Sequence, residues 1–131
     1  MWQQSENARL EQELAQYGSD ALFRKFRTAS REAVRLAAAL RGFIADDTAS
    51  EEEKLAYRDY LTRRPIPAAI ALIEENRMGD LEKLWAILPI SDSTLETLLK
   101  SSRKLRRQEA IVFLLREKAG RGTFRDRDFS L

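Results

Sequence analysis

Five basic residues lie within eight positions of this chain and form its densest cluster of like charge. They are Lys100, Arg103, Lys104, Arg106 and Arg107. Ammonium and guanidinium groups pair with carboxylates and phosphates, so the cluster could bind an acidic partner, either a protein or a nucleic acid. Cations also stabilise the C-terminus of a helix without any partner, and one helix is expected to end here. Both interpretations stay open, and these five residues are our candidate partner-binding site.

A second group of arginines recurs at helical spacing nearer the N-terminus. It consists of Arg24, Arg27, Arg31 and Arg35, which share one arc of a helix opposite an apolar face. Such a stripe could follow the phosphates of a nucleic acid. It is equally typical of a solvated helix surface, and no aromatic side chain interleaves it to stack on bases. Nucleic-acid binding through these four residues, together with the first cluster, is the alternative function.

Other chemistry is restricted by composition, because the 131 residues include no Cys and no His. Thiolate nucleophiles, imidazole bases and most zinc sites are therefore ruled out, and the chain has no Gly-rich phosphate loop. We expect no catalytic residue, no metal ligand, no cofactor and no enzymatic activity. A chain without Cys is also consistent with a reducing compartment, and we expect a cytoplasmic location.

The acidic residues have structural explanations. Ser50 and Glu53 form the pattern of a capping box, and the acids between them suit the positive end of a helix dipole. Asp46 and Asp47 lie in an expected connection and lack the alternating oxygen ligands of a calcium loop. Two carboxylates could still serve a hydrolase, but no spacing in the chain nominates a pair.

The overall composition indicates one helical domain. The chain is 44% hydrophobic with a formal net charge of +2, which suits a single domain with its own core. Its glycines and prolines fall at expected helix boundaries or after the last helix, and no segment shows sustained β alternation. This predicts an all-α fold of about six to seven helices in antiparallel hairpins. The longest apolar run, residues 66–73, is too short to span a bilayer, so no membrane partner is expected.

The first half of the chain is expected to begin with a peripheral helix over residues 5–17. Residues 21–41 then form one long helix, or two helices separated near residues 28–30. A connection at residues 42–49 leads to the helix that Ser50 starts. The apolar faces predicted for the first and last of these helices are Leu10, Leu14 and Tyr17, and Leu55, Tyr57, Tyr60 and Leu61.

The stretch from Pro65 to Ala119 has the densest apolar content and is expected to organise the fold. Four short helices are predicted, at residues 68–75, at 81–88, from a cap at Ser91 or Ser93 to about residue 106, and at 108–118. Gly79 is expected at positive φ and Asp80 as a cap. Residues 67–88 also match the segment 27 residues further on, which suggests two stacked hairpins that cover one another. The predicted core is Leu72, Leu84, Trp85, Leu98, Leu99, Ile111, Leu114 and Leu115.

Part of this stretch resembles an ankyrin repeat. Thr94-Leu95 and the later run from Glu109 to Leu115 are similar to the Thr-Pro-Leu-His start and the Glu-Ile-Val-x-Leu-Leu end of those units. The chain departs from the pattern in its shorter period, in the missing Pro-His pair and in the basic residues 104–107. The resemblance covers at most residues 68–119. It implies a degenerate helical-hairpin repeat of a class that binds proteins, and it transfers no binding residue.

These observations predict a single helical domain over residues 1–119, with repeat-like hairpins at 65–119. Residues 120–131 are predicted to form a mobile C-terminal tail with little regular structure. The function predicted is a non-catalytic protein–protein interaction module, with a protein partner that the sequence does not identify. Nucleic acid is the alternative partner.

Overall fold

The chain folds into a stack of helices, as the all-α prediction requires. A computed structural model describes the backbone of residues 5–129 and the side chains of residues 5–121. Within these residues there are eight helices and no strand, one helix more than the upper expected number. The helices are α1 (Glu6–Leu14), α2 (Ser19–Thr28), α3 (Glu32–Ile44), α4 (Glu51–Thr62), α5 (Pro65–Glu74), α6 (Met78–Trp85), α7 (Asp92–Lys104) and α8 (Gln108–Phe129).

The extra helix arises from a break between α2 and α3. Ala29 leaves the helix with an extended backbone, at φ −62° and ψ 131°. Arg35 secures this break, because its Nη2 donates a hydrogen bond of 2.8 Å to the Ala29 carbonyl oxygen. Of the two possibilities that the sequence left open for residues 21–41, the structure has two helices.

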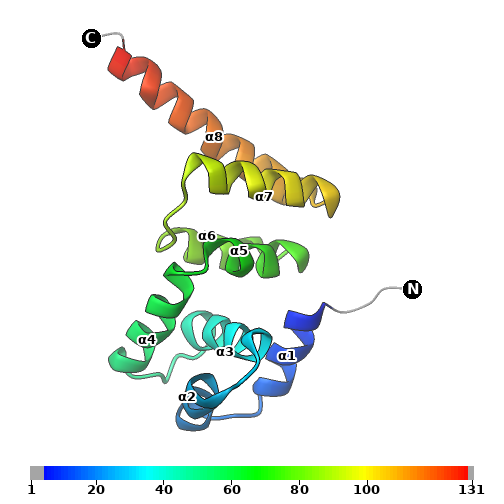
Figure 1. The fold of residues 1–131 in the computed structure, drawn as a ribbon, viewed down its shortest axis with the longest axis vertical. Coiled ribbons are helices and arrows are strands. Elements are labelled where there is room, and N and C mark those ends of the chain that lie inside the picture. The colour runs from blue at the N-terminus through cyan, green and yellow to red at the C-terminus, as the bar shows by residue number, and fades with distance from the viewer. Residues whose placement is uncertain (1–4, 130–131) are drawn as a thin grey trace.

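The helices are arranged along one long axis (Figure 1). In this view α2, α3 and α4 occupy the lower end, α5 and α6 the middle, and α7 and α8 the upper end. α1 packs on α3, and α5 contacts both its chain neighbour α6 and the later helix α7. The three-residue connections at 75–77 and 105–107 make α5–α6 and α7–α8 neighbouring pairs.

Both connections use the same backbone turn. Asn76 and Arg106 adopt the left-handed conformation, with φ of 56° and 58°. In each turn the left-handed residue donates its N–H three residues back, and the next residue donates five residues back, which is the Schellman arrangement. Arg106 follows Asn76 by 30 residues, so the turns recur at a longer interval than the 27-residue match.

The predicted turn at Gly79 is wrong. α6 already begins at Met78, and no glycine among the described residues has positive φ. Asp80 does not cap a helix, since its carboxylate accepts a hydrogen bond of 2.9 Å from Arg77 Nε. The turn forms at Asn76 instead, because Asn is the other residue that tolerates the left-handed region.

The core largely follows the predicted apolar faces. Leu72, Leu84, Leu98, Leu99 and Leu114 are buried in one continuous cluster, and Trp85 packs against it half-buried. Ile111, also predicted in this core, is half-buried and does not belong to the cluster. Three residues expected inside are instead exposed, namely Leu115 (41%), Leu55 (63%) and Tyr17 (39%). Leu115 is exposed because no later helix covers the outer side of α8 among the described residues.

The start of α4 and the end of α3 are fixed by local contacts. The Ser50–Glu53 capping box is confirmed, with both reciprocal hydrogen bonds present. Gly42, expected in the connection, lies inside α3, where the ring of Tyr57 packs so closely that a β-carbon would collide with it. Tyr57 is fully buried by this approach, so the glycine there is required by packing.

The predicted end of the last helix at Gly120 is also wrong, because α8 continues to Phe129. A helical glycine costs only about 1 kcal/mol relative to Ala, so it does not oblige a helix to stop. Arg121 also ties α8 to the start of α7, with a bond of 2.7 Å to the Ile90 carbonyl and one of 3.1 Å to Asp92. Mobility after Gly120 stays a prediction; the side chains of residues 122–131 lie outside the described part.

Candidate functional site

The structure brings the five residues of the predicted binding site to one turn, which we call the basic turn. Lys100, Arg103 and Lys104 lie in the C-terminal part of α7, and Arg106 and Arg107 lie in the connection to α8. The first four of the five side chains are exposed. None of these four forms an ion pair or side-chain hydrogen bond within the described residues. They are therefore cations held in water close to one another.

Arg107 behaves differently from the other four residues. Its side chain is half-buried, and Nη2 donates a hydrogen bond of 2.5 Å to the carbonyl oxygen of Glu74 at the end of α5. That carbonyl is one of the groups that a helix C-terminus leaves without an intrahelical partner. Arg107 thus anchors the basic turn on the preceding helix pair, so it is a structural residue and not part of the exposed surface.

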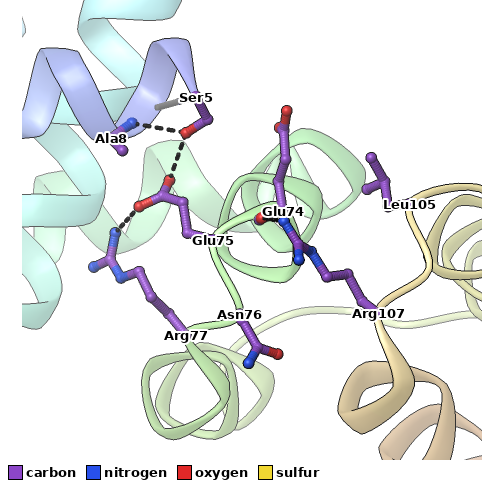
Figure 2. A pocket seen from close by; sticks show the side chains of 8 residues that line it. All are labelled: Ser5, Ala8, Glu74, Glu75, Asn76, Arg77, Leu105 and Arg107. Atoms are coloured by element: carbon purple, nitrogen blue, oxygen red, sulfur yellow. Dashed lines mark hydrogen bonds and ion pairs between the residues drawn. The ribbon is translucent and has the colours of Figure 1, made fainter. Parts of the chain in front are cut away.

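A cleft adjoins the basic turn, and Figure 2 shows its lining. This turn cleft has a volume of about 510 Å³. It lies between the start of α1, the α5–α6 turn and the α7–α8 turn, so three segments distant in the sequence meet there. The lining residues are Ser5, Ala8, Glu74, Glu75, Asn76, Arg77, Leu105 and Arg107. Of the five predicted site residues, only Arg107 lines the turn cleft.

Arg77 organises one wall of the turn cleft through three carboxylates, and we call this group the Arg77 network. Its Nη1 donates to Glu11 at 2.6 Å and to Glu75 at 3.2 Å, and its Nε donates to Asp80 at 2.9 Å. The Asn7 amide adds bonds of 2.6 Å to Glu11 and 3.0 Å to Glu75. The network joins α1 to the α5–α6 turn.

Burial shifts the proton affinities of this network. The Glu11 side chain is 9% exposed. Loss of hydration raises its pKa above the usual glutamate value, although Arg77 and Asn7 oppose the shift. Burial acts to lower the pKa of Arg77, but the hydrogen bond and charge of Glu11 outweigh it and hold that pKa above its usual value. The contacts with Arg77 and Asn7 therefore offset part of the hydration that the Glu11 carboxylate loses on burial.

Glu11 shares its raised pKa with the carboxyl groups that serve as general acids in enzymes. It does not line the turn cleft, and both its neighbours Asn7 and Arg77 bind the same oxygen, Oε2. These contacts are those of a structural ion cluster that joins α1 to the α5–α6 turn.

The alternative cluster is divided by the break between α2 and α3. Arg24 and Arg27 lie on α2, whereas Arg31 stands just before α3 and Arg35 lies within it. Arg27 lies 5.8 Å from the centre of the Phe23 ring, and Arg31 pairs with Glu6 at 3.1 Å. With Arg35 bound to Ala29, only Arg24 lacks a side-chain partner within the described residues. The four arginines therefore do not lie on one continuous helix, as the predicted stripe assumed.

Sequence reasoning missed the Arg77 network altogether. The sequence predicts the turn at Gly79 and assigns no role to Arg77, which lies between the predicted helices at 68–75 and 81–88. One signal was available: Asn76-Arg77 and Arg106-Arg107 each precede a helix, 30 residues apart. Glu11 gave no signal, because a charged residue next to Leu10 on a polar helix looks exposed.

The described residues contain no group of three or more His, Cys, Asp or Glu side chains placed to hold a metal ion. Within the same part of the chain, no helix is both long enough and apolar enough to cross a membrane.

Comparisons with known proteins add no relative to this description. No family model, no curated protein and no solved structure matches the chain. The case for a function therefore rests on the basic turn, the turn cleft and the physical chemistry of their residues.

Proposed function

We propose that this chain is a non-catalytic protein-interaction module whose basic turn binds an acidic segment of a partner protein. The observation that carries the proposal is the set of four exposed, unpaired cations on one turn: Lys100, Arg103, Lys104 and Arg106. No acidic residue occurs in the chain between Glu96 and Glu109. No carboxylate between these two positions in the sequence therefore competes for the four cations.

The anchoring of the turn supports the same proposal. The Schellman hydrogen bonds and the contact from Arg107 to Glu74 hold the backbone of the turn in one conformation. A surface that is already ordered loses less conformational entropy when a partner binds. The turn cleft beside it offers Leu105 and polar groups for further contacts with the partner.

The ankyrin-like resemblance of residues 68–119 remains a proposal that agrees with this role. Ankyrin units bind proteins through the surfaces of stacked helical hairpins, and the α5–α6 and α7–α8 pairs have equivalent turns. We propose that the two pairs are degenerate repeats with a 30-residue spacing of their turns. A protein-binding module needs no catalytic group, and this agrees with a structural role for Glu11 in the Arg77 network.

Nucleic acid is the competing partner, and the position of the arginines weighs against it. The α2 arginines lie at the opposite end of the long axis from the basic turn (Figure 1). Two distant clusters, one of them largely bound within the chain, offer a poor path for a phosphate backbone. The sequence around the basic turn contains no aromatic residue between Trp85 and Phe113 that could stack on bases.

The test is fluorescence anisotropy with three labelled probes: a Glu-rich peptide, a short DNA duplex and a single strand. We expect the peptide to bind at about 0.15 M salt, and the nucleic acids to bind only at lower salt. Changing Lys100, Arg103, Lys104 and Arg106 together to Gln should weaken peptide binding at least about tenfold. The melting temperature should stay nearly constant, since these side chains have no partner among the residues that the structure describes.

A matched control removes the same charge elsewhere. Arg9, Arg24, Lys25 and Lys83 are exposed and have no side-chain partner in the described part of the chain. Their replacement by Gln should leave peptide binding close to wild type. Equal losses in both quadruple variants would reduce the effect to net charge and reject the basic turn as a site. Micromolar nucleic-acid binding at about 0.15 M salt, lost only in the first variant, would establish the competing function.

A further inference from the structure

The opposite end of the molecule carries an exposed acidic surface. Asp47, Glu51 and Glu52 are exposed around the start of α4, and we call them the acidic end. They form no ion pair within the described residues. Asp46 does not belong to this surface, because its carboxylate accepts hydrogen bonds from Ser19 and Thr48, and these outweigh burial and lower its pKa.

The acidic end borders an apolar groove of about 320 Å³, the Leu55 groove. It is lined by Phe43, Ala49, Glu51, Lys54, Leu55 and Arg58. Leu55 is 63% exposed, the largest exposed fraction among the chain's large apolar side chains that the structure describes. Lys54 is occupied with the carbonyl oxygens of Gly42 and Phe43, at 2.8 and 3.0 Å, so it does not neutralise the acids. Arg58 is the remaining cation of the groove.

The basic turn is complementary to this surface. It presents four unpaired cations on long aliphatic stems, and the acidic end presents three unpaired carboxylates next to apolar area. Arg and Lys can lay their stems on apolar surface while their charged groups reach carboxylates at its rim. Arg106 lies at the tip of the turn in the left-handed conformation. Its side chain is therefore the leading candidate for contact with the carboxylates of the acidic end.

The two surfaces cannot meet within one molecule. In Figure 1 the start of α4 lies at the lower left, whereas the turn between α7 and α8 lies at the upper right. We propose that the basic turn of one copy docks on the acidic end and Leu55 groove of a second copy, in a head-to-tail contact. This rests on the proposed function and names one acidic partner for the same site, the chain itself.

A contact between two different surfaces leaves one free surface of each kind on every dimer. Further copies can therefore add until a ring closes, or without limit. Because the charges involved are exposed, salt should weaken the association strongly. Self-association that increases with concentration and decreases with salt is thus the expected behaviour.

Sedimentation velocity of the full chain at low salt and at about 0.5 M salt tests this proposal. We expect concentration-dependent association at low salt only. Two charge-reversed variants are then compared: Arg103→Glu with Lys104→Glu on the basic turn, and Glu51→Lys with Glu52→Lys on the acidic end. Each alone should lower the association constant at least about tenfold, and an equimolar mixture of the two should associate again. Arg24→Glu with Lys25→Glu, the matched control, should associate like wild type.

The outcomes separate this inference from the proposed function. A wild-type chain that stays monomeric at low salt would reject the second copy as partner, as would a mixture of the two variants that fails to associate. If that chain still binds the Glu-rich peptide through the basic turn, the proposed function stands and only this inference is lost. If neither self-association nor peptide binding occurs, both proposals are wrong. Thermal melting of each variant confirms that the reversed charges leave the fold intact.

Discussion

The α5–α6 and α7–α8 turns have the same backbone conformation, but their charged side chains lie in different surroundings. Both end a helix with a left-handed residue, Asn76 or Arg106, and both close with the same pair of hydrogen bonds. At the α5–α6 turn, Arg77 is enclosed by three carboxylates. At the α7–α8 turn, the neighbouring cations are exposed and unpaired.

This difference follows from the position of each turn in the stack. The α5–α6 turn is covered by α1, which supplies Asn7 and Glu11, so its charges must be paired before they can be buried. The α7–α8 turn has no such cover among the described residues, and water solvates its cations. The same backbone turn therefore forms a covered contact with α1 between α5 and α6, and an exposed charged surface between α7 and α8.

The largest effect expected is from Arg77→Ala. The substitution leaves Glu11 and Glu75 in a partly buried site without their cation, and should cost about 2–4 kcal/mol of unfolding free energy. Urea denaturation measures it. The matched Arg103→Ala change in the basic turn should cost less than about 0.5 kcal/mol. Similar losses in both variants would mean that the two turns are not distinct in the way described.

A smaller effect with the opposite sign is expected from Arg106→Gly. A β-carbon is unfavourable in the left-handed region, so glycine should stabilise the protein by about 0.5–1 kcal/mol. Asn76→Gly should gain only a few tenths of a kcal/mol, because asparagine already tolerates that conformation. Chemical denaturation of both variants measures these two changes in the free energy of unfolding. A loss of stability in Arg106→Gly would show that the Arg106 side chain contributes contacts of its own.

The smallest effect at neutral pH is expected from Glu11→Gln, which keeps the shape but removes the titrating group. Burial raises the pKa of Glu11 in the folded state, so the folded chain binds a proton at a higher pH than the unfolded chain. Wild type should therefore gain stability relative to the variant as pH falls through that raised pKa. The gain should be complete below the ordinary glutamate pKa of about 4.3. Melting of both proteins across this range measures the difference, and a relative loss would contradict the raised pKa.

Much of the fold could be read from local patterns. The capping box at Ser50 and Glu53, the helix start at Ser91 and the apolar faces of α5 and α7 depend on residues within one or two turns of each other. Local patterns predict helix ends poorly at glycines. Gly79 and Gly120 looked like helix ends, but a helix tolerates either residue when its neighbours support it.

The candidate site also has a part that the sequence predicts and a part that it does not. The basic turn was predicted because its residues are adjacent in the sequence, and the structure does place them together. The turn cleft could not be predicted, because Ser5, Glu75 and Arg107 come from three segments that meet only after folding.

The helical class, part of the buried core and the presence of a dense basic cluster follow from the sequence alone. These follow from apolar periodicity, capping residues and charge spacing, which act over a few residues. Which charges are paired depends on the tertiary structure. Arg77 and Arg107 occupy equivalent turn positions, yet α1 brings Glu11 to the first and the end of α5 brings a carbonyl oxygen to the second. Pairing depends on long-range contacts, because a charge is neutralised by whatever the fold places within a few ångströms of it.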